Sequence, residues 1–186
     1  MSQAATLYDS GKGLPLLKAA QGDLINSAIT FIRTFVKPKY AKDVDAIKVI
    51  LVKSMAQPGL CVNWDKITSK FLKPQMGELL ALEQMTGVTV LLNMSKPNEG
   101  ETLWAPVLFH EFGHVMFDGG GGPNEPAAWR VELEASYGWV KEHTDEKAIF
   151  SAFVKARKKS GMYASFPSGS EASAKDAFEK LENQSA

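Results

Sequence analysis

The feature that most constrains this chain is the segment HEFGH at residues 110–114, which lies inside a strongly apolar stretch. Apolar neighbours at helical spacing predict a helix that is buried on most of its surface. They are Leu103, Trp104, Val107, Leu108, Phe112, Val115, Met116 and Phe117. On a helix, positions i and i+4 lie on one face, so His110 and His114 should point to the same place. Burying two imidazoles and the Glu111 carboxylate is costly unless a partner satisfies them, so the segment predicts a polar site on a buried helix.

A metal ion is the partner that this spacing favours. Zinc is bound by imidazole nitrogens in tetrahedral sites, and a catalytic zinc site keeps one position for water. Glu111 directly follows the first histidine and can act as general base on that water, whose pKa zinc lowers to about 7. A chance match to the H-E-x-x-H pattern is expected on a solvated helix, whereas this helix is apolar. We therefore expect Zn²⁺ bound through His110 and His114, with Glu111 as the catalytic residue.

Composition narrows the class of protein further. The chain has 186 residues, which fits one domain, and its 21 basic and 21 acidic residues give no indication of nucleic-acid binding. The single cysteine, Cys61, excludes an intrachain disulfide and a thiolate cluster, and we expect it to be a small buried residue. No apolar run is long enough for a membrane span, and the N-terminus lacks an apolar signal region. A cytoplasmic location is therefore expected, with unconventional export left open.

The N-terminal part of the chain is expected to be helical. Residues 1–13 are small and polar and predict a loose arm, and residues 14–85 predict a helical N-terminal part. Four stretches carry apolar residues at helical spacing: 14–36, 43–56, 64–72 and 74–85. The centre of the second stretch, residues 47–52, is rich in β-branched residues and is also compatible with a strand.

We expect the metal-site core over residues 86–142 and C-terminal helices over 143–186. Residues 88–93 have the best strand pattern in the chain. Such a strand just before the motif helix either binds an extended peptide at a sheet edge or lies in the core. Residues 119–123 should end the motif helix and turn the chain back, and Asn124 should cap the next helix. Three helices are then expected, at 126–142, 145–158 and 171–181.

The helix over 126–142 should hold the third metal ligand, and its faces decide between two glutamates. Glu132 shares its stripe with small and apolar residues, namely Ala128, Trp129, Ala135, Ser136 and Trp139. Glu134 should instead form an exposed ion pair with Arg130, four residues earlier. Because a ligand has to point inward, we expect Glu132 to bind the metal, with Ser136 as a hydrogen-bond partner of a ligand.

A family resemblance supports this choice. HEFGH followed further along the chain by Glu132-Leu133-Glu134-Ala135 resembles the gluzincin metallopeptidases. The short spacer is most similar to the ImmA/IrrE-like metallopeptidases, whose ligand helix carries E-x-x-A. The resemblance covers residues 88–142 and implies a zincin-like fold, Glu132 as zinc ligand and Glu111 as base. Ser136 departs from the pattern, because related ligand helices often carry an acidic or amide residue there.

A second arrangement, toward the C-terminus, stays open. The segment Tyr163 to Pro167 followed by Glu171 faintly resembles lethal-factor-like zincins, in which a tyrosine and a glutamate follow the motif at longer range. That resemblance would make Glu171 the third ligand and Tyr163 the donor to the oxyanion that forms in the reaction. The other candidate donors are Tyr137, His143 and Arg130, and Glu134 also stays open as a third ligand.

These features predict a mostly helical α+β fold, a single zincin-like domain with a small sheet before the H-E-x-x-H helix. The expected activity is hydrolysis of peptide bonds in a protein or peptide substrate, with Zn²⁺ as cofactor. Two alternatives use the same motif: a zinc-binding regulatory or interaction module, and a zinc amidase acting on a non-protein amide. The carboxylate of Glu111 favours an enzyme, because a structural zinc site needs no general base.

Overall fold

The computed structural model describes residues 6–7, 19–38, 44–52, 57–66, 87–93, 98–99, 102–118, 124–161 and 172–183. The strands are β1 (Thr6–Leu7), β2 (Lys48–Val52), β3 (Gly59–Asn63), β4 (Val88–Asn93), β5 (Asn98–Glu99) and β6 (Thr102–Leu103). The α-helices are α1 (Ala19–Val36), α2 (Trp104–Asp118), α3 (Glu125–Glu142), α4 (Lys147–Lys159) and α5 (Ala172–Glu182). Short 3-10 turns lie at η1 (Val44–Ala46), η2 (Trp64–Lys66) and η4 (Thr144–Glu146). The fold is therefore α+β and mostly helical, with its sheet ahead of the motif helix α2, as expected.

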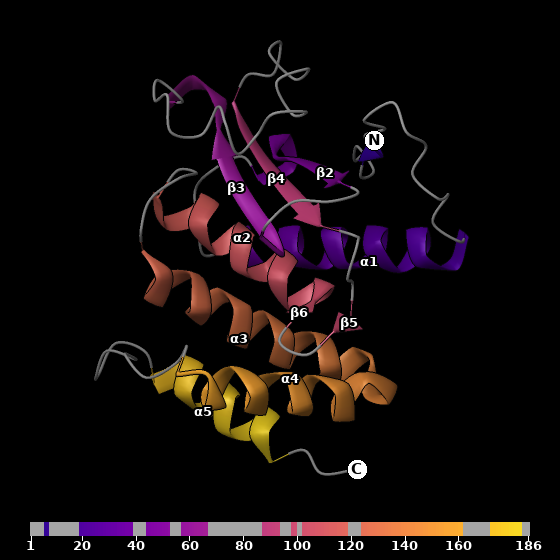
Figure 1. The fold of residues 1–186 in the computed structure, drawn as a ribbon, viewed down its shortest axis with the longest axis vertical. Coiled ribbons are helices and arrows are strands. Elements are labelled where there is room, and N and C mark those ends of the chain that lie inside the picture. The colour runs from indigo at the N-terminus through magenta and orange to yellow at the C-terminus, as the bar shows by residue number, and fades with distance from the viewer. Residues whose placement is uncertain are drawn as a thin grey trace.

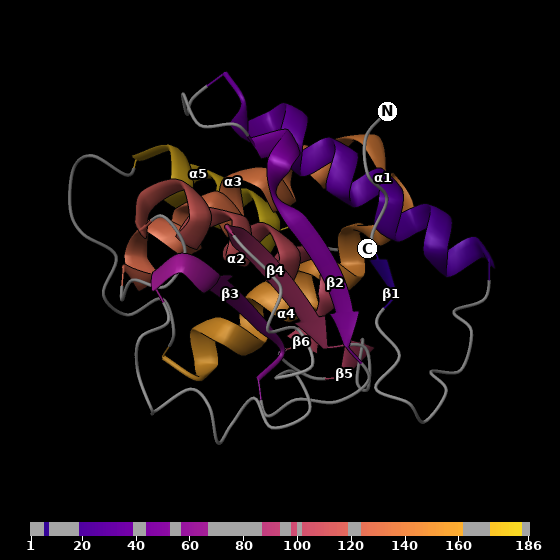
Figure 2. The same cartoon turned by 90° about the horizontal axis from the view of Figure 1, so that it is seen from above.

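The sheet has the strand order β1-β2-β4-β3 (Figure 2). Strands β1, β2 and β4 are parallel, and β3 runs antiparallel to β4, with Cys61 opposite Val90. The helix expected over 43–56 is wrong at its centre, because the Lys48–Val52 segment forms β2 and pairs with β4. Its β-branched residues suit a pleated, buried surface better than a helix. The helical N-terminal part expected over residues 14–85 also contains strand β3. Within the loose arm expected over residues 1–13, Thr6–Leu7 form strand β1.

Strand β4 confirms the best strand pattern and settles its position. It has β2 on one side and β3 on the other, and its four central residues are buried. The alternative that this strand forms a peptide-binding edge is therefore wrong, and the edge strands of the sheet are β1 and β3. The helices expected at 74–85 and over most of 64–72 lie outside the described residues.

The helices form layers on one side of the sheet. Figure 1 shows α2 directly below the strands, α3 below α2, and α4 and α5 below α3. Three aromatic rings join the first three helices: the Phe31 ring of α1 lies 5.7 Å from Phe109 of α2 and 5.4 Å from Trp139 of α3. These buried contacts confirm the expected apolar character of α2, and the predicted helices at 126–142, 145–158 and 171–181 appear as α3, α4 and α5. In the described part of the chain, no helix is long and apolar enough to cross a membrane.

Helices α2 and α3 approach each other closely at Gly113. A Cβ atom at this position would lie 2.6 Å from the Ala128 Cα atom and 3.0 Å from the Ala128 carbonyl oxygen. Because only a glycine leaves room for the backbone of α3, the fourth residue of HEFGH sets how near α3 can come. This approach carries the acidic residues of α3 to the histidines of α2.

Candidate metal centre

Helix α2 places both motif histidines at one buried position. His110 and His114 are each at least nine-tenths buried, and their Nε2 atoms lie 3.1 Å apart. The i and i+4 spacing explains this convergence, as the sequence predicted. Two ring nitrogens at this distance need a proton or a cation between them, because two lone pairs would repel each other.

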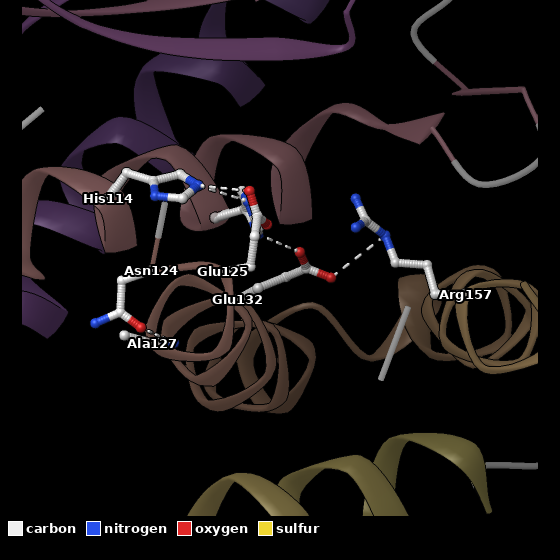
Figure 3. Close-up of polar contacts among 7 residues, drawn as sticks. His114, Asn124, Glu125, Ala127, Glu132 and Arg157 are labelled. Atoms are coloured by element: carbon white, nitrogen blue, oxygen red, sulfur yellow. Dashed lines mark hydrogen bonds and ion pairs between the residues drawn. The ribbon is translucent and has the colours of Figure 1, made fainter. Parts of the chain in front are cut away.

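The first turn of α3 adds a carboxylate to the two histidines. Glu125 places one oxygen 3.3 Å from Nε2 of His110 and the other 3.5 Å from Nε2 of His114 (Figure 3). Asn124 begins the helix by accepting a hydrogen bond from the backbone N–H of Ala127, which confirms the expected cap. One potential ligand atom from each of His110, His114 and Glu125 lies within 4.8 Å of the others. These three residues, two imidazoles and one carboxylate, could hold a metal ion.

Glu132 lies on the other side of the His110 ring. Its side chain is fully buried, with one oxygen 3.0 Å from Nδ1 of His110 and the other 3.4 Å from Nε of Arg157 on α4. Nδ1 and Nε2 of one imidazole point in different directions, so this carboxylate is not beside the Nε2 atoms. The sequence predicts Glu132 as the third ligand, but the residue that contacts both Nε2 atoms is Glu125.

The sequence contains a signal for Glu125 that the comparison of faces did not use. Glu132 was chosen because it shares a stripe of α3 with Ala128, and the same stripe extends three residues back to Glu125. Ala128 is the residue that Gly113 contacts, so residues one turn to either side of it face α2. The sequence predicts this helix from Pro126, whereas α3 begins one residue earlier and includes Glu125.

Strand β3 holds Glu111 against the edge of the sheet. Glu111 is buried, and the backbone of Cys61 donates a hydrogen bond to its carboxylate. A Cβ atom at Gly59 would lie 2.8 Å from both the Cγ and Oε1 atoms of Glu111. Gly59 therefore leaves the space that this carboxylate occupies. Cys61 itself is buried, as expected of a small residue in the core.

The pKa values show how strongly these groups interact. Burial, together with the charges of Glu125 and Glu132, raises the pKa of Glu111 to about 7. Burial alone would lower the pKa of His110, but its contacts with Glu125 and Glu132 and the charge of Glu111 outweigh this effect and raise the pKa to about 9. The hydrogen bond from His110 in turn lowers the pKa of Glu125. The site thus stabilises added positive charge at His110.

The remaining candidate residues lie elsewhere. Glu134 pairs with Arg130 at 3.1 Å, as expected, but the pair is partly buried and not exposed, because only 10% of the Glu134 side chain is accessible. The buried hydroxyl of Ser136 has no hydrogen-bond partner among the described residues, so the expected bond to a metal ligand is not formed there. Tyr137 packs under the ammonium groups of Lys141 and of Lys180 on α5.

The third histidine of the chain also lies away from the cluster. His143 stacks on Trp139, with 3.6 Å between ring centroids. It lies about 16 Å along α3 from Glu132, at 1.5 Å of rise per residue. Tyr163 and Glu171 fall outside the described residues.

Family models, curated proteins and solved structures were each compared with this chain, and none of them matched it. The candidate function is therefore argued from the geometry of the cluster on α2 and α3. That geometry defines a class of site: two buried histidines joined by the exposed Glu125, with the buried Glu132 on the other side of the His110 ring.

Proposed function

We propose that this protein is a zinc-dependent metallopeptidase with a zincin-like domain. In this proposal His110, His114 and Glu125 hold Zn²⁺, and Glu111 is the catalytic base. The observation that carries the proposal is the convergence of the three potential ligands within 4.8 Å, with the buried Glu111 on the same helix as both histidines.

The charges of the cluster fit a divalent cation. Glu111, Glu125 and Glu132 all act on His110, and Arg157 contributes one positive charge through its contact with Glu132. With both histidines neutral, these four groups carry two more negative charges than positive ones. Buried charges of one sign are costly unless they are paired or bind a metal. A divalent cation between the Nε2 atoms and Glu125 would balance them.

Glu111 has the environment that a general base needs. When bound, zinc polarises a carbonyl group and lowers the pKa of a water molecule to about 7. The carboxylate of Glu111 accepts a proton from the attacking water and passes it to the leaving amine. Burial against β3 and the hydrogen bond from Cys61 hold this carboxylate in one orientation. Preorganisation of this kind lowers the cost of reaching the transition state.

Strand β3 offers a place for an extended peptide. The carbonyl oxygen of Pro58 and the N–H of Trp64 form hydrogen bonds on the β4 side of this segment. In an antiparallel pair, successive residues direct their backbone N–H and C=O groups to opposite sides. The backbone groups of Gly59, Cys61 and Asn63 therefore point away from β4. The Cys61 N–H on this side bonds to the Glu111 carboxylate, so a peptide that adds to the β3 edge by β-augmentation would pair with other backbone groups of the strand and lie alongside Glu111. This geometry favours a peptide over a compact substrate.

A cleavage screen with a matched variant tests the proposal. Zinc-loaded wild-type protein and Glu111→Gln are incubated with a peptide library derived from a whole proteome, and new termini are identified by mass spectrometry. We expect cleavage by wild type, with new termini absent from Glu111→Gln and from protein treated with a chelator. Equal cleavage by wild type and Glu111→Gln would contradict the role of Glu111, and release of ammonia from non-peptide amides alone would favour an amidase.

A further inference from the structure

A buried ion pair lies behind the metal cluster and takes no part in the proposed proton transfers. Glu132 of α3 is 0% exposed and Arg157 of α4 is 6% exposed, and their closest charged atoms are 3.4 Å apart. Figure 3 shows the two side chains meeting from separate helices, with Glu132 between Arg157 and the cluster. The guanidinium also lies over the Phe153 ring, 4.7 Å from its centroid. This pair connects α4 to the site.

Stability does not explain why this pair is buried. Removing both charges from water costs several kcal/mol for each ion, and replacing such a pair by apolar residues of similar volume is often neutral or stabilising. A buried pair that adds little to folding stability can instead serve another role. The position of Glu132 indicates what that is.

The Glu132 carboxylate contacts the nitrogen of His110 that faces away from the cluster. With one oxygen 3.0 Å from Nδ1, the carboxylate favours the tautomer that carries its proton on Nδ1. In that tautomer the lone pair of Nε2 is free and points toward His114 and Glu125. Acceptors on the far nitrogen of a metal-binding histidine fix its orientation and raise its basicity.

We infer that Glu132 and Arg157 are positioning residues: Arg157 holds the Glu132 carboxylate, and Glu132 holds His110 in the tautomer and orientation that bind zinc through Nε2. This inference rests on the proposed metal centre and gives α4 a role in it. It also assigns Glu132 a function different from the ligand role that the sequence predicts.

The test is a charge-removing double variant compared with a matched control. Glu132→Gln/Arg157→Met removes both charges and keeps similar side-chain volumes. The control, Glu134→Gln/Arg130→Met, removes a different ion pair of α3, whose charged atoms lie 3.1 Å apart. In the described interactions, this second pair contacts neither histidine. Zinc dissociation constants are measured by competition with a chromophoric chelator, and thermal unfolding is followed for the metal-free proteins.

We expect the Glu132→Gln/Arg157→Met protein to bind zinc about 10–100-fold more weakly than wild type, the usual effect of losing such a partner. Its metal-free unfolding temperature should stay equal to that of wild type or rise. The control should keep the zinc affinity of wild type. Equal zinc affinity in the double variant and wild type would overturn the inference, as would a loss of affinity that merely follows a loss of stability.

Proton NMR of the zinc-loaded protein gives a readout that a merely structural pair would not change. The Nδ1 proton of His110 should resonate far downfield in wild type and in the control, because an ionised carboxylate oxygen lies 3.0 Å from Nδ1. It should move upfield in Glu132→Gln, where the acceptor is a neutral amide. An unchanged resonance in Glu132→Gln would show that Glu132 is not the acceptor.

The outcomes separate this inference from the proposed function. If wild type binds no zinc, both fail. If wild type binds zinc and His110→Ala does not, the metal centre stands, and the inference is decided by the variants of Glu132 and Arg157. If Glu132→Gln loses zinc as completely as His110→Ala, Glu132 is a ligand and the positioning role is refuted.

Discussion

Replacing Gly113 by alanine should separate α2 from α3 and weaken metal binding at the proposed centre. The added Cβ atom would lie 2.6 Å from the Cα atom of Ala128, 3.0 Å from its carbonyl oxygen and 3.2 Å from its Cβ atom. The first two belong to the backbone of α3, which cannot rotate away as a flexible side chain can. The whole of α3 has to shift, and Glu125 and Glu132 shift with it.

The size of the effect follows from two opposing terms. Overpacking a filled interface costs about 1–3 kcal/mol, and alanine in place of glycine inside a helix recovers about 1 kcal/mol. We expect a net loss of up to about 2 kcal/mol, which lowers the unfolding temperature of a chain this long by up to roughly 8 °C. Because a ligand also moves, zinc affinity should fall by more than the loss of stability alone would cause.

Gly138 on α3 provides the control. A Cβ atom there would lie 3.1 Å from the Phe31 Cζ atom, and its other near neighbours are also ring atoms of side chains. Gly138→Ala should therefore keep both the stability, to within about 1 kcal/mol, and the zinc affinity of wild type. Both variants are measured by thermal unfolding and by chelator competition. A Gly113→Ala protein that matches wild type in both would refute the proposed reason for this glycine.

Three further predictions concern catalysis and metal binding. Glu111→Gln should lower turnover by at least about 10²–10⁴-fold while zinc affinity stays unchanged, because it removes a base and not a ligand; steady-state kinetics with a cleaved peptide and the chelator assay test both parts, and wild-type turnover would contradict it. Gly59→Ala, whose methyl group would meet the Glu111 carboxylate at 2.8 Å, should lower turnover by about 10²-fold and leave zinc bound; an unchanged rate would show that Glu111 does not depend on this contact. Removing zinc should lower the free energy of unfolding by about 2.7 kcal/mol relative to protein in zinc at 100 times its dissociation constant; calorimetry with and without chelator measures this difference, and identical curves would argue against a metal centre in the folded state.

The helices around the site could be predicted because their patterns are long and their ends carry signals. Helix α3 begins at an asparagine cap and a proline, and its buried stripe includes Ala128 and Glu132, as the spacing indicated. The N-terminal part was harder, because the Lys48–Val52 segment has the length and apolar content of either a strand or part of a helix. Its pairing with β4 decides the matter, and that pairing depends on residues far away in the sequence.

The placement of the two histidines within α2 could be predicted from the sequence, whereas the choice of the glutamate that reaches them from α3 could not. The i and i+4 rule places His110 and His114 together without any tertiary information. The choice between Glu125 and Glu132 depends on where α3 crosses α2, and a contact between Gly113 and Ala128 sets that crossing. Periodicity identifies the stripe that faces α2, but it does not tell which carboxylate on that stripe reaches Nε2 and which reaches Nδ1.

The most direct test of the metal centre is a crystal structure of the zinc-loaded protein, with the ion located by anomalous scattering at the zinc edge. We predict one zinc ion about 2.0–2.2 Å from Nε2 of His110, Nε2 of His114 and a carboxylate oxygen of Glu125. Glu132 should remain on Nδ1 of His110 and outside the coordination shell. A zinc ion bound by Glu132 or Glu171 in place of Glu125, or one that lies away from both histidines, would contradict the proposed centre.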